Sequence, residues 1–313
     1  MTDELDAASY RDRIAAALTT YACGDAFGVP WEGAAAADID LGTAATLPVR
    51  PGRPRGATSD DTALTLLVAE VLTTAANEDP GSRFLRLLSE RAETVPGLGP
   101  STLAAIRAFR ESGRRPETGG DTNGAAMRAL PAGWAVPVDE PDRRRALSLG
   151  LSRVTHPSPD AQCAAAVISA CASWSLEGAD AQRLLEVARD EARIATGEFG
   201  GGRRLGDLLA AVATDRWSAA PSGVSLEPYD TVAAVLHCIV TARSPIDAMR
   251  AAVALGGDTD TVAALAGGLL GAGFPSAEAA LTQIPWSSAV LLPDAAVVTG
   301  FATGLAAARA AGR

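Results

Sequence analysis

The sequence predicts an all-α fold, and three observations lead to that prediction. Apolar residues recur at the spacing of a helix face, aromatic residues are scarce, and no stretch alternates between apolar and polar residues over the length of a strand. Hydrophobic residues make up 48% of the 313 residues, whereas aromatic residues make up only 4%. A core of small and branched aliphatic side chains suits closely packed helices better than a sheet.

Helical spacing is clearest in the segment that follows Asp180. Its apolar residues fall on one helix face: Ala181, Leu184, Leu185, Ala188 and Ala192. Asp180 and Gly197 are suitable start and stop signals for this helix. Similar segments begin near Asp6, Asp61, Ser82, Ser101, Asp142, Pro159, Pro228, Pro245, Thr259 and Asp294. We therefore expect a bundle of ten or more helices.

Irregular segments rich in Gly, Pro and Ala separate some of these helices. They span residues 33–58, 114–124 and 216–228. Loops of this length often lie over a functional site. None resembles a long interdomain linker, and the sequence has no fixed-period repeat. The simplest expectation is one domain over residues 1–313.

The chain is acidic, with a net charge of −10 from 27 basic and 37 acidic residues. This balance argues against general nucleic-acid binding, which needs a basic surface. An acidic protein that binds an anionic ligand must supply positive potential locally, and metal ions and helix N-termini are the available means.

Targeting and redox features are few. The acidic N-terminus has no apolar signal segment, and the longest apolar run, residues 262–274, is too short and too rich in Gly to span a bilayer. We therefore expect a cytoplasmic protein without membrane contact. The cysteines form no CxxC motif and are expected to be buried, reduced thiols: Cys23, Cys163, Cys171 and Cys238.

The first acidic cluster joins a loop to an apolar helix. It consists of Ser59, Asp60, Asp61 and Thr62. A helix cap is the simple interpretation, because Ser and Asp accept hydrogen bonds from free amides and their charge suits the N-terminus of a helix. Taken alone, this cluster favours the cap.

The second acidic cluster has the same construction. Asp258, Thr259, Asp260 and Thr261 follow a Gly pair and precede an apolar helix. A cap needs one short polar residue, whereas two clusters with surplus carboxylates and hydroxyls provide the hard oxygen ligands of a Mg²⁺ or Mn²⁺ site. The absence of His and Cys from both clusters argues against zinc. At this point capping and metal binding both stay open.

Residues 21–32 end the first long helix and contain two further carboxylates. The small residues of this stretch permit tight packing or the approach of a ligand. Asp25 is a candidate buried partner of another helix rather than a ligand. Glu32 begins the irregular loop and is free to point into a site, although a surface position is the simpler interpretation.

Two other segments are candidates for substrate contact, and the second histidine is not. Asn123 and Gly124 precede a helical run, and their amides can bind an anion, although a plain junction is the alternative. His156 stands before a helix and is either a structural partner or a substrate contact. His237 lies inside an apolar helix and is expected in the core.

Five motifs occur together: GDAFGVPWE, SDDTAL, TNGAAMRALP, a TH pair and GGDTDTVAALAGGLLGA. Their order and spacing resemble the ADP-ribosylglycohydrolase family, which includes dinitrogenase-reductase-activating glycohydrolases and ADP-ribosyl-acceptor hydrolases. The resemblance runs from about residue 12 to about residue 285. It implies a single-domain orthogonal helix bundle with two Mg²⁺ or Mn²⁺ ions at the mouth of a cleft.

The resemblance also implies roles for individual residues. The metal ligands would be Ser59, Asp60, Asp61, Asp258, Asp260 and Thr261. Glu32 and Asp61 would be catalytic, and which carboxylate acts as general base stays open. The substrate would contact Asn123, Gly124, Met127 and His156. Asp121 and Thr122 replace an aromatic residue and Gly of many members, which suggests a different acceptor preference or a solvent-facing Asp121.

The implied reaction is hydrolysis of the bond between ribose C1″ and an acceptor atom in an ADP-ribosylated protein or small molecule. Two alternatives remain: a metal-dependent phosphohydrolase acting on an ADP-ribose-type phosphate, and a non-catalytic ADP-ribose-binding protein. The family pattern implies a monomer. The sequence leaves the acceptor open among arginine, serine, O-acetyl, nucleic-acid and small-molecule linkages.

Overall fold

The computed structural model describes residues 6–74 and 77–311. Over these two ranges it contains 15 α-helices, five short 3₁₀ helices and no β-strand, which confirms the predicted fold class. The α-helices are α1 (Ala7–Gly28), α2 (Leu41–Ala44), α3 (Asp60–Thr73), α4 (Pro80–Arg91), α5 (Pro100–Ser112), α6 (Leu130–Trp134), α7 (Pro141–Ser152), α8 (Pro159–Leu176), α9 (Ala181–Phe199), α10 (Arg204–Ala213), α11 (Pro228–Thr241), α12 (Pro245–Leu255), α13 (Thr259–Gly271), α14 (Ala277–Gln283) and α15 (Ala295–Ala310).

Every helix expected from periodicity is present, but one predicted end is wrong. Gly197 lies inside α9, which ends at Phe199, and Gly200 takes the left-handed conformation that closes a helix (φ 79°). The prediction missed α2, α6, α10 and α14. Three of these have seven residues or fewer, too short to show a helical period.

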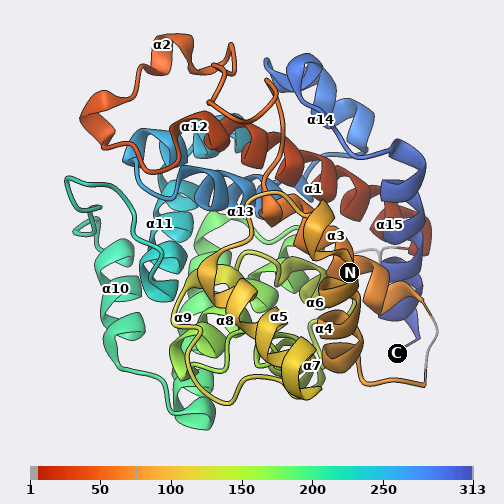
Figure 1. Cartoon of the computed structure of the whole chain (residues 1–313). Helices are drawn as coiled ribbons and strands as arrows, with labels where there is room; N and C mark the ends of the chain where they lie inside the picture. The colour runs from red at the N-terminus through yellow and green to blue at the C-terminus, as the bar shows by residue number, and fades with distance from the viewer. Residues whose placement is uncertain (1–5, 75–76, 312–313) are drawn as a thin grey trace.

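Helices α1 and α13 pack along each other and form the most extensive helix pair of the described structure (Figure 1). Two glycines of α1 make this close approach possible. A Cβ atom on Gly24 would lie within 3.0 Å of the Ala263 backbone, and one on Gly28 within 3.0 Å of the Asp260 backbone. These distances are too short for any side chain, so the small residues of α1 serve tight helix packing.

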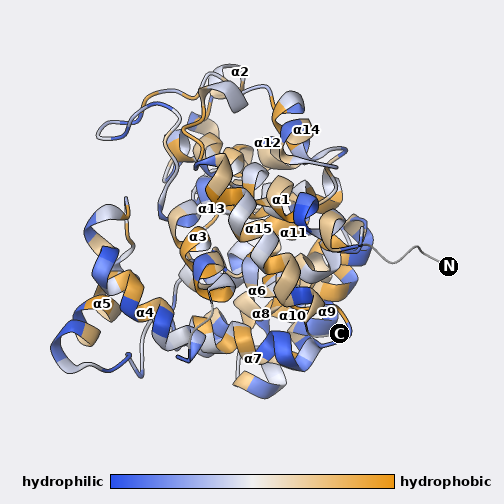
Figure 2. Cartoon of the chain, turned by 90° about the vertical axis from the view of Figure 1, so that its right-hand side faces the viewer, coloured by the Kyte–Doolittle hydropathy of each residue, from blue (hydrophilic) through white to orange (hydrophobic). Residues whose placement is uncertain are grey.

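Among the described residues, the buried apolar side chains form one large cluster, a smaller one, and a third of only Ala16, Phe274 and Ala280. The large cluster includes side chains from Tyr10 in α1 to Ala306 in α15. The smaller cluster lies among α3, α4 and α5 and includes Leu64, Phe84 and Ile106. Figure 2 shows hydrophobic residues gathered on inner helices such as α13, whereas the outer helix α7 is largely hydrophilic.

Three loops meet beside the N-terminus of α13. Gly33 donates its amide to the carbonyl of Gly257 (2.8 Å), and Gly257 donates to Ala34 (2.8 Å). On the other side, Asp258 donates its amide to Val224 (2.9 Å). The loops before α3 and before α11 therefore hold the turn that carries the second acidic cluster.

The cysteines are buried as expected, whereas His237 is not. All four cysteines of the sequence are buried and free within the described ranges, as predicted. The prediction that His237 belongs to the core is wrong, because its ring is half-buried and lies 4.9 Å from the ring of Trp217, at a tilt. In the part of the chain that the structure describes, no helix is long and apolar enough to cross a bilayer.

Candidate metal and substrate site

The two acidic clusters, nearly 200 positions apart in sequence, line one cavity of about 240 Å³. The first cluster begins α3 and the second begins α13. The cavity is also lined by most of the other residues implicated by the sequence: Glu32, Asn123, Gly124, Met127 and His156. The structure therefore brings together residues from five separate segments of the chain.

Helix α1 holds the starts of α3 and α13 in place. Gly28 lies against the backbone of Asp260, and Thr259 donates its hydroxyl to the carbonyl of Gly28 (2.9 Å). The fully buried carboxylate of Asp25 accepts hydrogen bonds from the Ser59 amide (3.0 Å) and from the amide and hydroxyl of Thr62 (3.1 and 2.5 Å). Asp25 is therefore a buried partner of α3, which is one of the two roles the sequence allowed.

In the first cluster, capping and surplus carboxylates coexist. Ser59 caps α3, since its hydroxyl accepts a hydrogen bond from the Asp61 amide (3.1 Å). The same hydroxyl donates to the Asp61 carboxylate (3.0 Å). Because Ser59 satisfies the cap, the carboxylates of Asp60 and Asp61 are left to line the cavity.

In the second cluster, the carboxylate at the cap position is used elsewhere. Asp258 occupies the N-cap of α13, but no capping bond from its side chain occurs among the described residues. The amide nitrogen of Asn123 instead donates to Asp258 and to the hydroxyl of Thr231 (2.8 Å). Asp260 accepts the amide of Thr261 (3.0 Å). Both carboxylates exceed what capping requires.

Burial and mutual repulsion raise the pKa values of the four carboxylates. Burial and then the neighbouring charges of Asp25 and Asp60 hold the pKa of Asp61 well above its usual range. Burial and then the charges of Asp61 and Asp258 do the same for the pKa of Asp260. Mainly through burial, the pKa of Asp60 rises to about 7 and that of Asp258 to about 6. Carboxylates gathered in this way need protons or a cation between them.

The donor set suits a hard divalent cation. Four carboxylates and the hydroxyls of Ser59 and Thr261 are oxygen ligands of the kind that Mg²⁺ and Mn²⁺ prefer. Asp61 and Thr261 line the same cavity, so a hydroxyl of the second cluster shares the cavity wall with a carboxylate of the first. Within residues 6–74 and 77–311, no three His, Cys, Asp or Glu side chains are already arranged as metal ligands.

Glu32 stands at the mouth of the cavity, on the loop bonded to the turn of Gly257. Its side chain is 38% exposed and forms an ion pair with Arg50. The adjacent Gly33 amide bond to Gly257 holds this loop against the second cluster. A carboxylate in this position is accessible to solvent and lines the same cavity as the acidic clusters.

The segment before α6 forms another wall. Gly124 packs so closely on His156 that a Cβ atom there would lie 2.6 Å from ring carbon Cε1. The ring nitrogens of His156 lie 3.1 Å from the hydroxyl of Thr122 and 2.8 Å from that of Thr155. The Met127 carbonyl accepts the hydroxyl of Tyr21 (2.7 Å). Asp121 is exposed, as one of the two sequence interpretations expected.

Residues 97–102 form a further wall of the cavity that was not predicted from the sequence. Ser101 and Thr102 of α5 line the cavity, as does Leu98 before the helix. The Gly-Leu-Gly-Pro stretch at 97–100 marks a loop that enters a helix and was the only available signal. Of the predicted loops, 216–228 contributes Leu226 to the cavity, and 114–124 contributes Thr122, Asn123 and Gly124.

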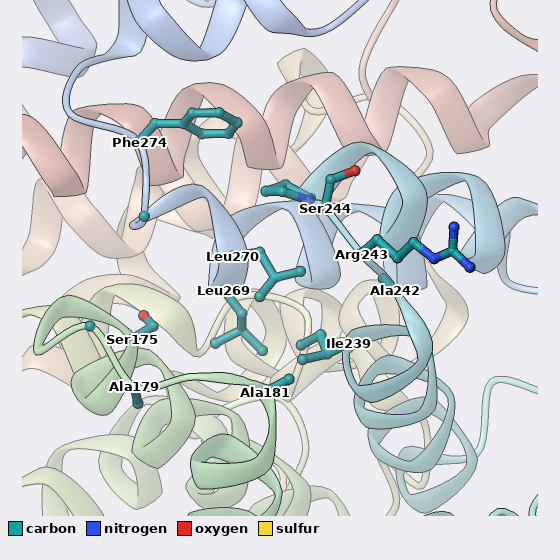
Figure 3. Close-up of a pocket in the computed structure, with 13 residues that line it drawn as sticks. Ser175, Ala179, Ala181, Ile239, Ala242, Arg243, Ser244, Leu269, Leu270 and Phe274 are labelled. Atoms are coloured by element: carbon teal, nitrogen blue, oxygen red, sulfur yellow. The ribbon is translucent and has the colours of Figure 1, made fainter.

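A second cavity, of about 360 Å³, lies away from the acidic clusters (Figure 3). Its walls are mainly aliphatic and include Leu269, Leu270 and Ile239. The only charged residue lining it within the described chain is Arg243, whose guanidinium points away from Leu269 and Leu270 (Figure 3). This lining offers no group for acid–base or metal chemistry, so the acidic cavity is the candidate site.

Comparisons with known proteins identify the family through a sequence profile and a solved structure. The sequence profile described as ADP-ribosylglycohydrolase matches residues 6–286. The chain is 30% identical over 239 residues to the uncharacterized protein YegU of Escherichia coli (strain K12), which covers 68% of this chain and 70% of YegU. A solved structure titled ADP-ribosylglycohydrolase-related protein complex is similar with a TM-score of 0.76 and 26% identity, over 96% of this chain and 99% of that one.

Proposed function

We propose that this chain, which belongs to the ADP-ribosylglycohydrolase family, hydrolyses the bond between ribose C1″ and an acceptor atom in an ADP-ribosylated protein or small molecule. The observation that carries the proposal is the meeting of both acidic clusters in one cavity beside Asn123 and Gly124. We also propose that residues 1–313 form one domain, since the large buried cluster includes side chains from Tyr10 to Ala306.

The residues that would hold two divalent ions are those of the two clusters: Ser59, Asp60, Asp61, Asp258, Asp260 and Thr261. When bound, Mg²⁺ or Mn²⁺ would orient the ribose hydroxyls and lower the pKa of a water molecule. The bond from Asn123 to Asp258 fixes the orientation of one carboxylate, as outer partners of metal ligands commonly do.

The other residues would bind the substrate and move the proton. Glu32, exposed at the mouth of the cavity, is the proposed general base that takes a proton from the attacking water. The backbone amides around Gly124 would receive the diphosphate, which explains how a chain of net charge −10 binds an anion. His156 and Met127 complete this wall of the cavity.

Glu32→Gln is expected to lower turnover by roughly 100-fold or more, the usual contribution of a general base. Metal binding should be retained, because the proposed ligands are untouched. The matched control is Glu78→Gln, since Glu78 is similarly exposed (35%) and also pairs with an arginine, Arg86. Steady-state turnover and Mn²⁺ titration check both variants. Full turnover in Glu32→Gln would assign the base to a metal-bound Asp.

Removal of metal is expected to change how stability depends on pH. In chelator, the raised pKa values of Asp258 (about 6) and Asp60 (about 7) mean that the folded chain retains protons that the unfolded chain releases. Folding stability without metal should therefore fall as pH rises from about 4 to about 7. Mn²⁺ binds only the ionised carboxylates, so its stabilising effect should be larger at pH 8 than at pH 6.

Thermal unfolding in EDTA and in Mn²⁺, at those two pH values, measures this linkage. The result that contradicts the metal assignment is a melting temperature that Mn²⁺ leaves unchanged at both pH values.

The acceptor can be identified with a panel of ADP-ribosylated substrates carrying arginine, serine, O-acetyl and nucleic-acid linkages. Each is incubated with Mg²⁺ or Mn²⁺, and release of the unmodified acceptor is measured. The proposal expects metal-dependent release from at least one linkage class. Tight binding of ADP-ribose without release from any of them would instead indicate a non-catalytic binding protein.

A further inference from the structure

Arg128 is a buried cation that forms no ion pair with any carboxylate in the described part of the chain. It is only 2% exposed, and among the described residues no carboxylate lies within ion-pair distance of its guanidinium. A charge in this position is costly to bury, so its presence calls for an explanation beyond packing. It lies directly behind the segment that carries Asn123 and Gly124.

The guanidinium of Arg128 joins three segments of the chain. It donates to the carbonyl of Gly124, to the carbonyl of Leu151 (3.2 Å) and to the hydroxyl of Thr155 (2.7 Å). Its carbon Cζ lies 4.7 Å from the centre of the Phe84 ring. Arg128 therefore fixes both the loop of Gly124 and the residue that precedes His156.

The hydrogen bond from Arg128 to Thr155 determines which partner donates in the next hydrogen bond, between Thr155 and His156. Because Thr155 Oγ1 accepts from Arg128, its own hydrogen is available to His156 Nδ1, 2.8 Å away. Nδ1 then acts as an acceptor, and the proton of a neutral imidazole lies on Nε2. The opposite tautomer would leave the Thr155 hydrogen without an acceptor among the described residues.

The imidazole of His156 is neutral near pH 7, so its single proton lies on either Nδ1 or Nε2. Burial, and next the charge of Arg128, lower the pKa of His156 to about 3. A cation on this side of the ring also favours the arrangement in which the unprotonated nitrogen faces it.

The same direction continues to the wall of the cavity. His156 Nε2 donates to the hydroxyl of Thr122 (3.1 Å), which donates to the hydroxyl of Ser101 (3.3 Å). Ser101 lines the cavity, and within the described ranges its own hydrogen has no acceptor. The chain of hydrogen bonds that starts at a buried cation thus ends at a hydroxyl in the cavity wall.

We propose that Arg128 is a positioning residue that holds His156 as the Nε2–H tautomer, and that Ser101 is a substrate-binding residue whose hydroxyl donates to the diphosphate of the ligand. The Ser101 part rests on the proposed function, which supplies the diphosphate. The Arg128 part concerns the chain without ligand and can be tested separately.

The Arg128 part is tested by ¹⁵N spectroscopy of histidine-labelled protein. The chain has only two histidines, so His237→Gln assigns both ring systems. The expected spectrum shows His156 with protonated Nε2 and unprotonated Nδ1. Thr155→Val, which keeps the shape of the side chain but removes the hydroxyl, should give a mixture of tautomers, as should Arg128→Met if it folds.

Two outcomes overturn this part of the inference. One is a protonated Nδ1 in the unchanged chain. The other is an unchanged Nε2–H tautomer in folded Thr155→Val, which would show that the relay does not set it. Neither outcome depends on the proposed activity.

The Ser101 part is tested by binding of ADP-ribose and of adenosine, which lacks the diphosphate, in Mn²⁺. Ser101→Ala should weaken ADP-ribose roughly tenfold, as expected for one hydrogen bond to a charged group, and leave adenosine unchanged. In turnover the loss should appear in KM rather than in kcat. Ser101→Thr should restore ADP-ribose binding, and Ser112→Ala, at the far end of α5, is the matched control.

Equal ADP-ribose affinity in Ser101→Ala and the unchanged chain would overturn the Ser101 assignment and leave the proposed function standing. Absence of ADP-ribose binding in the unchanged chain would overturn both the Ser101 assignment and the proposed function. The histidine spectrum still decides the role of Arg128 in that case.

Discussion

Asp258→Asn is expected to yield a folded chain that binds Mn²⁺ poorly and turns over substrate at least about 100-fold more slowly. Loss of an outer partner of a metal ligand commonly costs 10–100-fold, and loss of a ligand should cost more. Asp61→Asn should behave in the same way, because it removes a ligand from the other cluster. Both substitutions keep the size of the side chain.

The same variants should be at least as stable as the unchanged chain when metal is absent. Asp61 and Asp258 are buried and repel neighbouring carboxylates, so a neutral amide removes an unfavourable charge. Lower activity together with unchanged or higher stability in chelator distinguishes a ligand from a residue needed for folding. Asp247→Asn, at an exposed position of α12, is the control. Full metal-dependent turnover in either variant would show the ligand assignment to be wrong.

Gly28→Ala is expected to destabilise the chain by roughly 3 kcal/mol or more, or to prevent folding. The added Cβ atom would lie within 3.0 Å of the backbone of Thr259 and Asp260, which cannot turn aside as a flexible side chain can. Helix propensity alone predicts the opposite, a gain of about 1 kcal/mol for Gly to Ala. The sign of the effect therefore reports the contact between α1 and α13.

The matched control is Gly197→Ala in α9. There, a Cβ atom would meet nothing within 4 Å in the described structure, so only the propensity gain should remain. Urea unfolding followed by circular dichroism, in EDTA to remove the contribution of metal, compares the two. An increase in stability for both variants would contradict the close packing of α1 on α13.

The fold class could be predicted because helical periodicity is a local property. The helices of eleven or more residues and their approximate starts were all visible in the sequence, whereas the ten-residue α10 was missed. The end of α9 was misplaced because Gly197 and Gly200 look alike in sequence, and only the backbone shows which of them is left-handed. Helices as short as α2 lack enough turns to show a repeat.

The candidate site was predictable in its parts rather than in its arrangement. The surplus of carboxylates in both clusters is a sequence property, but their meeting depends on how α1 packs against α3 and α13. Asn123 was expected to approach the substrate, and the structure places its side-chain amide on Asp258 instead. Its backbone amide donates to the carbonyl of Leu226 (2.9 Å), so in this pair it is the amide of Gly124 that we still predict to contact a diphosphate.

Some residues of the site gave no usable signal. Ser101 is an ordinary polar residue in the first turn of a helix, and only the position of α5 brings it to the cavity. In the sequence, Arg128 is one of 27 basic residues and nothing distinguishes it from the others. The structure distinguishes it, because it is buried and has no carboxylate partner within the described chain. Burial of a charge is a tertiary property that a local pattern does not carry.

The most direct test of the account is the identity of the products formed from an ADP-ribosylated substrate of the linkage class that the acceptor panel selects, with Mn²⁺ and with EDTA. The account predicts ADP-ribose and the unmodified acceptor in Mn²⁺, and neither in EDTA. Release of inorganic phosphate or AMP would contradict it in favour of a phosphohydrolase. Equal turnover in EDTA would contradict the metal site formed by the two acidic clusters.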